Sequence, residues 1–458
     1  MTAWIGVKSR DCTRGARPAP SFGFDKADLH RYIPRRSMFF LRLLCARSRT
    51  VRAVLLCAVG LIAVFATVPS QPQARGSAAA SEVRALWVTR GSLTSPQAIS
   101  AMVRSAAASG FNTLLVQVRG RGDAYFSTGL EPRAHLLASQ PASFDPLAAT
   151  IALARERGLR VHAWVNVNLV SSGPELPASR AHIVYRNPDW LMVPRELAFR
   201  LGRVDARSPE YLGRLARWSR AAEDVEGLYL SPIHEGAIDH VVGILEHLAT
   251  SYRLDGIHLD YVRYPGPEFD YSRAALTAFR THLTPDMTVA ERRRFAGSDI
   301  TTLITMTDMY PERWMMFRRA RLNTLVMRAR TAIKRSGPAL LFSVAVYPDP
   351  DDAAERRLQD WRTWIENGMI DVVCPMAYTP DAAVFASQIA SVRQISGDQP
   401  VWAGIGAYRL SSSQTVANIR TARRLGAKGV VLFSYDSLMR SPDGRDYLSS
   451  VGRAAFTP

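Results

Sequence analysis

Eight short segments rich in branched and aromatic residues recur along the chain after Ser81, and helical stretches separate them. They are expected to be strands at residues 83–89, 113–120, 160–169, 254–262, 340–348, 371–378, 401–408 and 429–438. Strands that alternate with helices form parallel sheets, and eight such units predict an α/β (β/α)₈ barrel, or TIM barrel. The alternative is an open doubly wound sheet, which usually carries a glycine-rich phosphate loop after its first strand. The segment "VTRGSLTS" (88–95) does not resemble such a loop.

Two long connections interrupt this regular alternation, at roughly residues 170–236 and 266–313, after the third and fourth strands. Both follow strand ends on the same rim of the predicted barrel. Long loops in compact domains are usually functional or disordered. The first contains "RNPDWLMV" and "GLYLSPIHEG", whose apolar and aromatic residues predict a folded insertion that walls one side of a cleft.

The fourth strand, within "YRLDGIHLDYVRYP" (252–265), has one apolar and one polar face. Side chains alternate along a strand, so His258 and Asp260 lie on one face and Ile257 and Leu259 on the other. A barrel needs its outer face apolar against the helices, so the polar pair is expected to point inward. Asp255 begins the strand and is expected to cap a turn at the opposite end of the barrel.

Other strands repeat this pattern, with polar residues near their ends. The third strand places His162, Trp164 and Asn166 on one face, and the second places Gln117 and Arg119 opposite Val116 and Val118. In the eighth strand, Ser434 and Asp436 share one face and Phe433 and Tyr435 the other. In barrel enzymes the carboxyl ends of the strands hold the active site. We therefore expect a polar site there, in which His162 and His258 form hydrogen bonds with the substrate or with Asp260.

Aromatic residues follow many of the strands, and such rings stack on the apolar faces of sugars while polar groups bind the hydroxyls. Each ring alone could equally belong to the barrel core. The tyrosines and the arginine after the fourth strand suit the same chemistry. The predicted carbohydrate-binding residues of this kind are Trp87, Trp164, Tyr261, Arg263, Tyr264, Tyr347, Tyr378, Trp402, Tyr408 and Tyr435.

Glycoside cleavage generally needs two carboxyl groups, one acid and one base or nucleophile. Asp260 is the first candidate, against the alternative that it only forms a salt bridge with Arg263. The predicted partners are Asp436 and Asp123, with Asp349 and Glu131 as further alternatives. No GxSxG elbow indicates a serine hydrolase.

Metal and nucleic-acid chemistry are not favoured. Metal-dependent barrels of the amidohydrolase type usually carry an HxH pair on strand one, which here reads "RALWVT", so no metal or other cofactor is predicted; a metal-dependent hydrolase remains a minor alternative. The net charge of +18 would suit nucleic acid, but half of it lies in residues 1–52 and no basic stripe is interleaved with aromatics. A mildly cationic surface is compatible with anionic envelope polymers.

The N-terminus resembles a secretory signal. Arg47, Arg49 and Arg52 precede the uncharged run Ala53–Val68, and small residues follow near Ala78–Ala80. The run is short for a membrane span, which needs about 20 residues, although an uncleaved anchor is the alternative. We expect residues 1–80 to form this extension, with Met38 as the start, and residues 81–458 to form one exported catalytic domain.

Several segments together resemble the glycosyl-hydrolase-like family 10. They are "QVRGRGDAYF", the "EP" at 131–132, "DPLAATIALARERGLRVHAWVN", "DGIHLDYVRYP", "PMAY" and "VLFSYDSL", and the similarity runs from about Val83 to Leu438. The resemblance implies a TIM barrel, export to the envelope or outside, and hydrolysis of glycosidic bonds; at least one relative acts on peptidoglycan glycan strands stripped of stem peptides. The cleft residues implied by the motif match are Gln117, Arg119, Asp123, Trp164, Asn166, Asp260, Tyr264 and Tyr378.

The sequence thus predicts an exported glycoside hydrolase acting on a bacterial polysaccharide, with peptidoglycan glycan as one substrate. Its membrane contact would be limited to the N-terminal signal or anchor. The second hypothesis is a carbohydrate-binding barrel of the envelope without catalytic activity.

Overall fold

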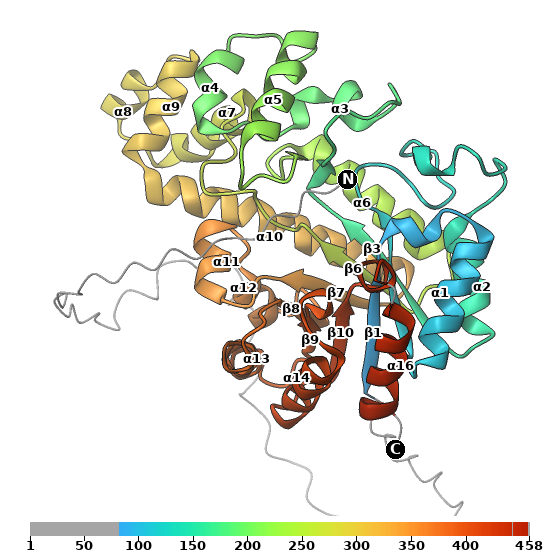
Figure 1. The fold of residues 1–458 in the computed structure, drawn as a ribbon. Helices are drawn as coiled ribbons and strands as arrows, with labels where there is room; N and C mark the ends of the chain where they lie inside the picture. Colours follow the sequence, from blue (N-terminus) through green and yellow to red (C-terminus); the bar gives the residue numbers. More distant parts are fainter. Residues whose placement is uncertain (1–81, 442, 457–458) are drawn as a thin grey trace, which may run out of the picture. The chain divides into compact units, whose positions relative to one another are not determined.

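The structure is a computed structural model that describes residues 82–441 and 443–456. Eight parallel strands close into a barrel in the order β1-β10-β9-β8-β7-β6-β3-β2, which confirms the predicted fold (Figure 1). All eight strands lie within the predicted segments. Their bounds are β1 Val83–Val88, β2 Thr113–Arg119, β3 Arg160–Asn166, β6 Gly256–Asp260, β7 Leu341–Val346, β8 Val372–Ala377, β9 Trp402–Ile405 and β10 Gly429–Phe433.

Helices surround the barrel and follow its strands. The main ones are α1 Pro96–Ala108, α2 Pro146–Arg155, α6 Glu235–Ser251, α10 Pro311–Ser336, α12 Trp361–Glu366, α13 Ala382–Ser396, α14 Ser412–Arg424 and α16 Gly444–Ala455. Short elements in the loops are η1 Arg90–Leu93, η2 His135–Leu137, α11 Pro350–Arg356, η5 Ala407–Arg409 and α15 Tyr435–Met439.

Local sequence explains where the helices begin. Ser95 caps α1 by accepting a hydrogen bond from the amide of Ala98, and Asp145 caps α2 by accepting one from the amide of Ala148. Gly158, after α2, adopts a φ of 67°, a left-handed conformation that favours glycine. Asp255 accepts a hydrogen bond from the amide of Val161 at 2.8 Å, so it fastens the start of β6 to β3 at the amino end of the barrel.

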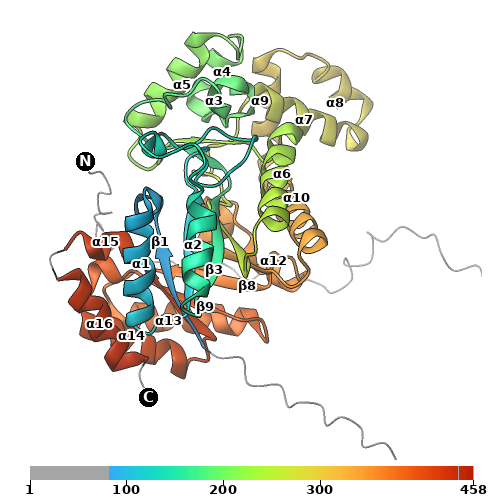
Figure 2. The same cartoon turned by 90° about the vertical axis from the view of Figure 1, so that its right-hand side faces the viewer.

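Both insertions are folded, and they share a core. The first contains β4 Leu169–Ser171, α3 Ile183–Arg186, η3 Pro188–Trp190, α4 Arg195–Leu201, α5 Pro209–Ala221 and β5 Leu228–Tyr229; the second contains α7 Arg273–Leu283, η4 Thr284–Asp286, α8 Val289–Arg294 and α9 Ile300–Met309. Figures 1 and 2 show their helices gathered at one end of the barrel. Ala198 of α4 packs in one apolar cluster with residues of α7, α9 and α10. The insertions therefore form a single layer beyond the carboxyl ends of β3 and β6.

The two faces of the predicted strands behave as alternation requires. Ile257 and Leu259 belong to the large outer core between strands and helices, whereas Trp164 belongs to a separate cluster inside the barrel. The predicted assignment of residues 433–436 to the two faces of the eighth strand was wrong. β10 ends at Phe433, whose ring packs inside the barrel against Trp87, and Ser434 instead caps α15. Alternation could not extend to Asp436 because the strand had already ended.

The predicted signal segment and the rest of residues 1–81 lie outside the described residues. Within the part of the chain that the structure describes, no helix combines the length and apolar character needed to cross a bilayer.

Candidate functional site

Asp260 ends β6 at the carboxyl end of the barrel and is held through one oxygen. Its Oδ1 accepts hydrogen bonds from the backbone amide of Tyr261 at 2.6 Å and from Nη1 of Arg263 at 3.0 Å. No described residue donates a hydrogen bond to its Oδ2. A fully buried atom in that position would count as a buried polar atom without a partner, and Oδ2 is not one of these. The residue is 7 % exposed. One oxygen is therefore anchored while the other reaches solvent.

Arg263 lies between two aromatic rings beside this carboxylate. Its guanidinium carbon is 3.8 Å from the centre of the Tyr261 ring and 5.4 Å from that of Tyr347. Burial alone would lower the pKa of Arg263, but Asp260, Tyr347, Tyr261 and Glu226 together outweigh it and keep that pKa well above its ordinary value. Arg263 thus stays charged and stabilises the charge of Asp260. The salt bridge considered from the sequence is present, and it leaves one carboxylate oxygen free.

A row of polar side chains runs from Asp260 across the neighbouring strand ends. Asn166 is the direct partner of Asp260 in the β3–β6 ladder, and its Oδ1 accepts a hydrogen bond from Nε2 of Gln117 at 3.5 Å. The Oε1 of Gln117 in turn accepts from Nη1 of Arg90 at 2.8 Å. Donors and acceptors in such a row suit the hydroxyl groups of a sugar.

Aromatic rings pack together across the interior at the same end of the barrel. Tyr378 stacks on Phe433 with ring centres 5.3 Å apart, and Trp87 and Tyr408 lie 6.0 Å from Phe433 on other sides. Trp164 is 6.4 Å from the same ring. Tyr408 is 45 % exposed, whereas the two tryptophans are nearly buried. Tyr408 is therefore the ring in this group most accessible to a ligand.

His258 contacts Trp87 of this aromatic group inside the barrel. Its Nε2 accepts a hydrogen bond from the indole of Trp87 at 3.0 Å, so the proton of the neutral ring lies on Nδ1 and is donated to Oγ of Ser343 at 2.9 Å. Burial lowers the pKa of His258 to about 3, so the ring is neutral near pH 7. The expected hydrogen bond from His258 to the substrate or to Asp260 is not formed, because both ring nitrogens are bonded to Trp87 and Ser343.

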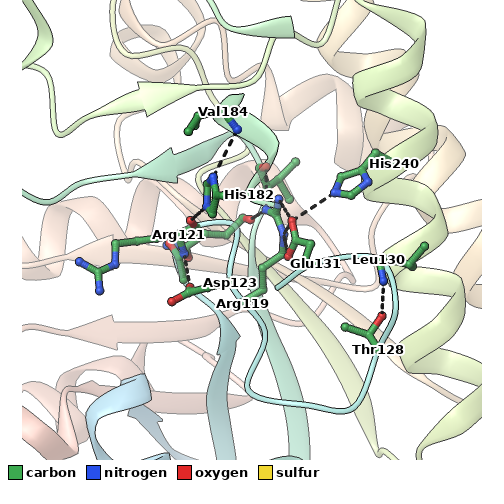
Figure 3. A network of polar contacts seen from close by, with 12 residues as sticks. Arg119, Arg121, Asp123, Thr128, Leu130, Glu131, His182, Val184 and His240 are labelled. Atoms are coloured by element: carbon green, nitrogen blue, oxygen red, sulfur yellow. Dashed lines mark hydrogen bonds and ion pairs between the residues drawn. The ribbon is translucent and has the colours of Figure 1, made fainter. Parts of the chain in front are cut away.

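Arg119 and Glu131 form a buried ion pair beside the site (Figure 3). The Nη2 of Arg119 donates to Oε1 of Glu131 at 2.7 Å, and His240 of α6 lies 3.2 Å from the same oxygen. Burial would raise the pKa of Glu131, but Arg119 and His240 together lower it to about 2. A carboxyl group that stays ionised in this way joins the loop after β2 to β2 and α6, and it cannot serve as an acid near neutral pH.

The two predicted partners of Asp260 differ in their surroundings. Asp436 accepts hydrogen bonds from the amide of Thr89 at 2.6 Å and the hydroxyl of Ser92 at 2.8 Å, and burial raises its pKa. Asp123 is partly exposed, and its Oδ1 accepts from the amide of Arg121 at 3.2 Å. Asp436 therefore fastens the loop after β1, whereas one oxygen of Asp123 has no partner among the described residues.

Four predicted substrate-binding residues lie away from this site. Tyr264 is fully buried, and its hydroxyl is 3.4 Å from the carbonyl of Arg318 in α10. Tyr435 packs in the outer core. His162 and Trp402 pack against each other near the amino ends of β3 and β9, with ring centres 5.5 Å apart. The alternation of side chains along a strand does not determine how far along the barrel axis a residue lies. It also does not determine where a side chain points once the strand has ended. Asp349, a further alternative, caps α11.

Sequence reasoning missed two residues of the site. Arg90 lies two residues after the end of β1, so its place near a strand end was the available signal. Glu226 precedes β5 in the first insertion and accepts a hydrogen bond from the hydroxyl of Tyr229 at 2.5 Å; its charge acts on Arg263 and Tyr261. No pattern in the first insertion marked it. Among the described residues, no group of three or more His, Cys, Asp or Glu is placed to hold a metal ion.

The fold and its polar, aromatic strand ends define a barrel of the glycosidase type. The model of the family named glycosyl hydrolase-like 10 matches residues 82–409, more than half of the chain. The chain therefore belongs to that family, as its motifs predicted.

Two relatives and two solved structures show how far the likeness extends. The glycosyl hydrolase YngK of Bacillus subtilis is 24 % identical over 381 residues, covering 74 % of this chain and 63 % of the relative. The glycosyl hydrolase DigH of Escherichia coli K12 is 23 % identical over 291 residues, covering 59 % and 55 %. This chain thus spans less than two thirds of both relatives.

Among solved structures, the PgaB (BpsB) glycoside hydrolase domain of Bordetella bronchiseptica is 16 % identical with a TM-score of 0.56, and the match covers 81 % of this chain and 99 % of that one. The catalytic domain of a Paenibacillus polymyxa β-amylase is 10 % identical with a TM-score of 0.54, covering 83 % and 100 %. At these identities the likeness concerns the fold.

Proposed function

We propose that this protein is an exported glycoside hydrolase that cleaves O-glycosidic bonds of a bacterial envelope polysaccharide, with the glycan strands of peptidoglycan as the first substrate to test. The observation that carries the proposal is the half-anchored carboxylate of Asp260 at the carboxyl end of β6. Membership of a glycosyl hydrolase-like family and the names of the two relatives support it. The apolar N-terminal run supports export.

In this proposal Asp260 acts as the base or nucleophile. Arg263 stabilises the charged carboxylate, and the solvent-facing Oδ2 is the reactive atom. The polar row of Arg90, Gln117 and Asn166 binds sugar hydroxyls, and Tyr408 offers a ring face to the sugar. The remaining requirement is a second carboxyl group that protonates the leaving oxygen.

Asp436 and Asp123 are the two choices for this acid, each supported by a different observation. A catalytic acid needs a raised pKa, which burial gives to Asp436. Asp123 has the more open carboxylate. The variants Asp436→Asn and Asp123→Asn can be compared on substrates with a good leaving group. Such a leaving group departs without being protonated, so these substrates do not need the catalytic acid. The acid variant regains activity on an activated aryl glycoside, and the other variant shows no such rescue.

Release of reducing ends from purified glycan strands tests the function itself. The expected result is release by the wild-type protein and at least a 100-fold loss in Asp260→Asn. The anchoring of Asp260 by Arg263 favours a second candidate, a barrel that binds glycan without cleaving it. Binding of the strands with no reducing-end release after long incubation supports that candidate and overturns the hydrolase.

A further inference from the structure

A small cavity opens where the first insertion meets the loop after β2 and helix α6. Its volume is about 70 Å³, which is roughly the share of two water molecules in the liquid. Its lining includes Leu130 and Glu131 of the loop, Ile183 of α3, Trp190 of η3 and His240 of α6. Figure 3 shows Leu130, Glu131 and His240 beside one another. Three separate parts of the chain therefore build this one cavity.

The ion pair of Arg119 and Glu131 separates the cavity from the strand ends. Glu131 lines the cavity, whereas Nη1 of Arg119 donates to the carbonyl of Val167, just after β3, at 3.1 Å. The lining includes neither Asp260 nor a side chain of the polar row beside it. A group bound in the cavity is therefore held apart from the bond that the proposed carboxylates would cleave.

Trp190 forms an aromatic wall of the cavity. A Cβ atom added to Gly236 would lie 2.6 Å from a ring carbon of Trp190, so the ring lies directly on the first turn of α6. The centre of its ring is 5.4 Å from that of His234 and 6.2 Å from that of His240. Ile183, which is buried, adds apolar surface. The cavity thus has a closely packed apolar side that can hold a methyl group.

Unused hydrogen-bonding groups also line the cavity. Within the described ranges, no residue bonds to the side-chain amide of Asn187 or to the indole nitrogen of Trp190, and neither group is fully buried. His240 uses its Nε2 toward Glu131, at 3.2 Å. Because an ionised carboxylate only accepts hydrogen bonds, this nitrogen carries the proton, and Nδ1 of the neutral ring is left as an acceptor. Donors and an acceptor are therefore both available.

An acetamido group has the matching set of features. It combines a methyl group, a carbonyl that accepts a hydrogen bond and an N–H that donates one. The methyl group would pack on Trp190 and Ile183, the carbonyl would accept from Asn187, and the N–H would donate to His240. A whole sugar ring exceeds the space of two water molecules, so the ring itself would lie outside, near Leu130, which is 38 % exposed.

We propose that this cavity binds the acetamido group of an N-acetylated amino sugar in the polysaccharide. The proposal rests on the proposed function for the class of ligand, but it does not depend on cleavage. It gives the protein a contact with the glycan away from the strand ends. That contact favours N-acetylated glycans over glycans of the same linkage without the substituent.

Equilibrium binding of two matched oligosaccharides tests this proposal. Chitotetraose carries an acetamido group on every sugar, and cellotetraose has the same linkage with a hydroxyl group in its place. Binding is measured by calorimetry with the full chain carrying Asp260→Asn, so that neither probe is consumed. We expect chitotetraose to bind at least tenfold more tightly, because the acetamido group adds hydrogen bonds and buries a methyl group.

Two variants and one control locate this preference on the chain. In the same background, Asn187→Ala removes a donor, and Ala181→Phe, at an exposed position of the lining, fills the cavity. Each is expected to lower the ratio of chitotetraose to cellotetraose affinity at least fivefold. Asn367→Ala, at an exposed position after α12, keeps the ratio. Circular dichroism checks the fold of each variant, and if one cavity variant does not fold, the other decides.

The outcomes separate this proposal from the hydrolase. A preference for chitotetraose that the cavity variants reduce and Asn367→Ala keeps supports the cavity site, even if the wild-type chain cleaves neither probe. A preference that survives in either folded cavity variant overturns the site, even if the wild-type chain cleaves chitotetraose, because the acetamido groups are then recognised elsewhere. Equal binding of the two probes, no binding of either, or an equal effect of Asn367→Ala overturns it as well.

Discussion

Asn166 and Asp260 are direct partners in the ladder between β3 and β6, so the backbone itself sets their spacing. Neighbouring strands lie about 4.8 Å apart, and side chains from paired positions point to the same side. The positions of the proposed catalytic carboxylate and of the amide next to it are thus set by the barrel strands more than by loop conformation.

Replacing Asp260 by asparagine is expected to reduce hydrolysis of the true substrate at least about 100-fold, because the amide keeps the shape of the side chain but loses its charge. Initial rates of reducing-end release, measured on folded protein, check this. Asp224→Asn, at an exposed position, is the matched control and keeps the wild-type rate. A wild-type rate in Asp260→Asn removes this residue from the mechanism.

Replacing Asp436 by asparagine is expected to lower the free energy of unfolding by about 1–3 kcal/mol at pH 7, because an NH₂ group cannot accept the hydrogen bond from Thr89 or Ser92. The pKa of Asp436 in the folded chain is raised above its ordinary value of 3.8. Ionisation of this carboxyl group therefore lowers the stability of the fold as the pH rises from 3.8 through the raised pKa. The variant lacks this contribution. Urea unfolding at several pH values measures both effects, and unchanged stability at pH 7 contradicts the fastening role.

Breaking the buried ion pair with Glu131→Gln is expected to cost about 3–5 kcal/mol at pH 7, since Arg119 is left with an unpaired buried charge. The pKa of Glu131 is about 2 in the folded chain against an ordinary 4.5, so its contribution is complete above pH 4.5 and is lost as the pH falls toward 2. The stability difference between wild type and variant should shrink over this interval in denaturant titrations. A difference that stays constant with pH indicates that packing, and not charge, is responsible.

His162→Leu tests the polar residue buried near the amino ends of the strands. The Nδ1 atom of His162 is buried without a hydrogen-bond partner, and burial lowers the pKa of the ring to about 3. The wild-type ring therefore reduces stability as the pH falls from 6.5 toward 3, because only the unfolded chain takes up the proton readily. We expect the variant to be as stable as wild type at pH 7 and to lose less stability on acidification. A loss of more than about 2 kcal/mol at pH 7, larger than the worth of one typical hydrogen bond, speaks for an unrecognised role.

Export is tested by fusing residues 38–81 to an alkaline phosphatase that lacks its own signal. The expected result is phosphatase activity outside the cytoplasm. Replacement of three leucines and isoleucines of the apolar run by lysine should abolish that activity, because a charged run no longer serves as the apolar core of a signal. Phosphatase activity that persists after this change argues against a signal in this segment.

The sequence was sufficient to predict the barrel and its polar inner face, because strand patterning and alternation are local properties. His258 and Asp260 point inward for that reason. Alternation failed where the backbone leaves the extended conformation: Tyr261 has a φ of 53°, and β10 ends at Phe433. His162 shows the other limit, since depth along the barrel axis depends on register between strands that lie far apart in the sequence.

The shared core of the insertions has a consequence for engineering. Gly202 after α4 lies so close to Ile300 of α9 that an added Cβ would be 2.5 Å from its side chain, and Arg273 of α7 donates to the carbonyl of Gly202 at 2.9 Å. The two insertions thus form one module in space, although α6 and β6 separate them along the chain. A chimaera that exchanges ligand preference between relatives should transplant both loops together, because either one alone would present half of a foreign core.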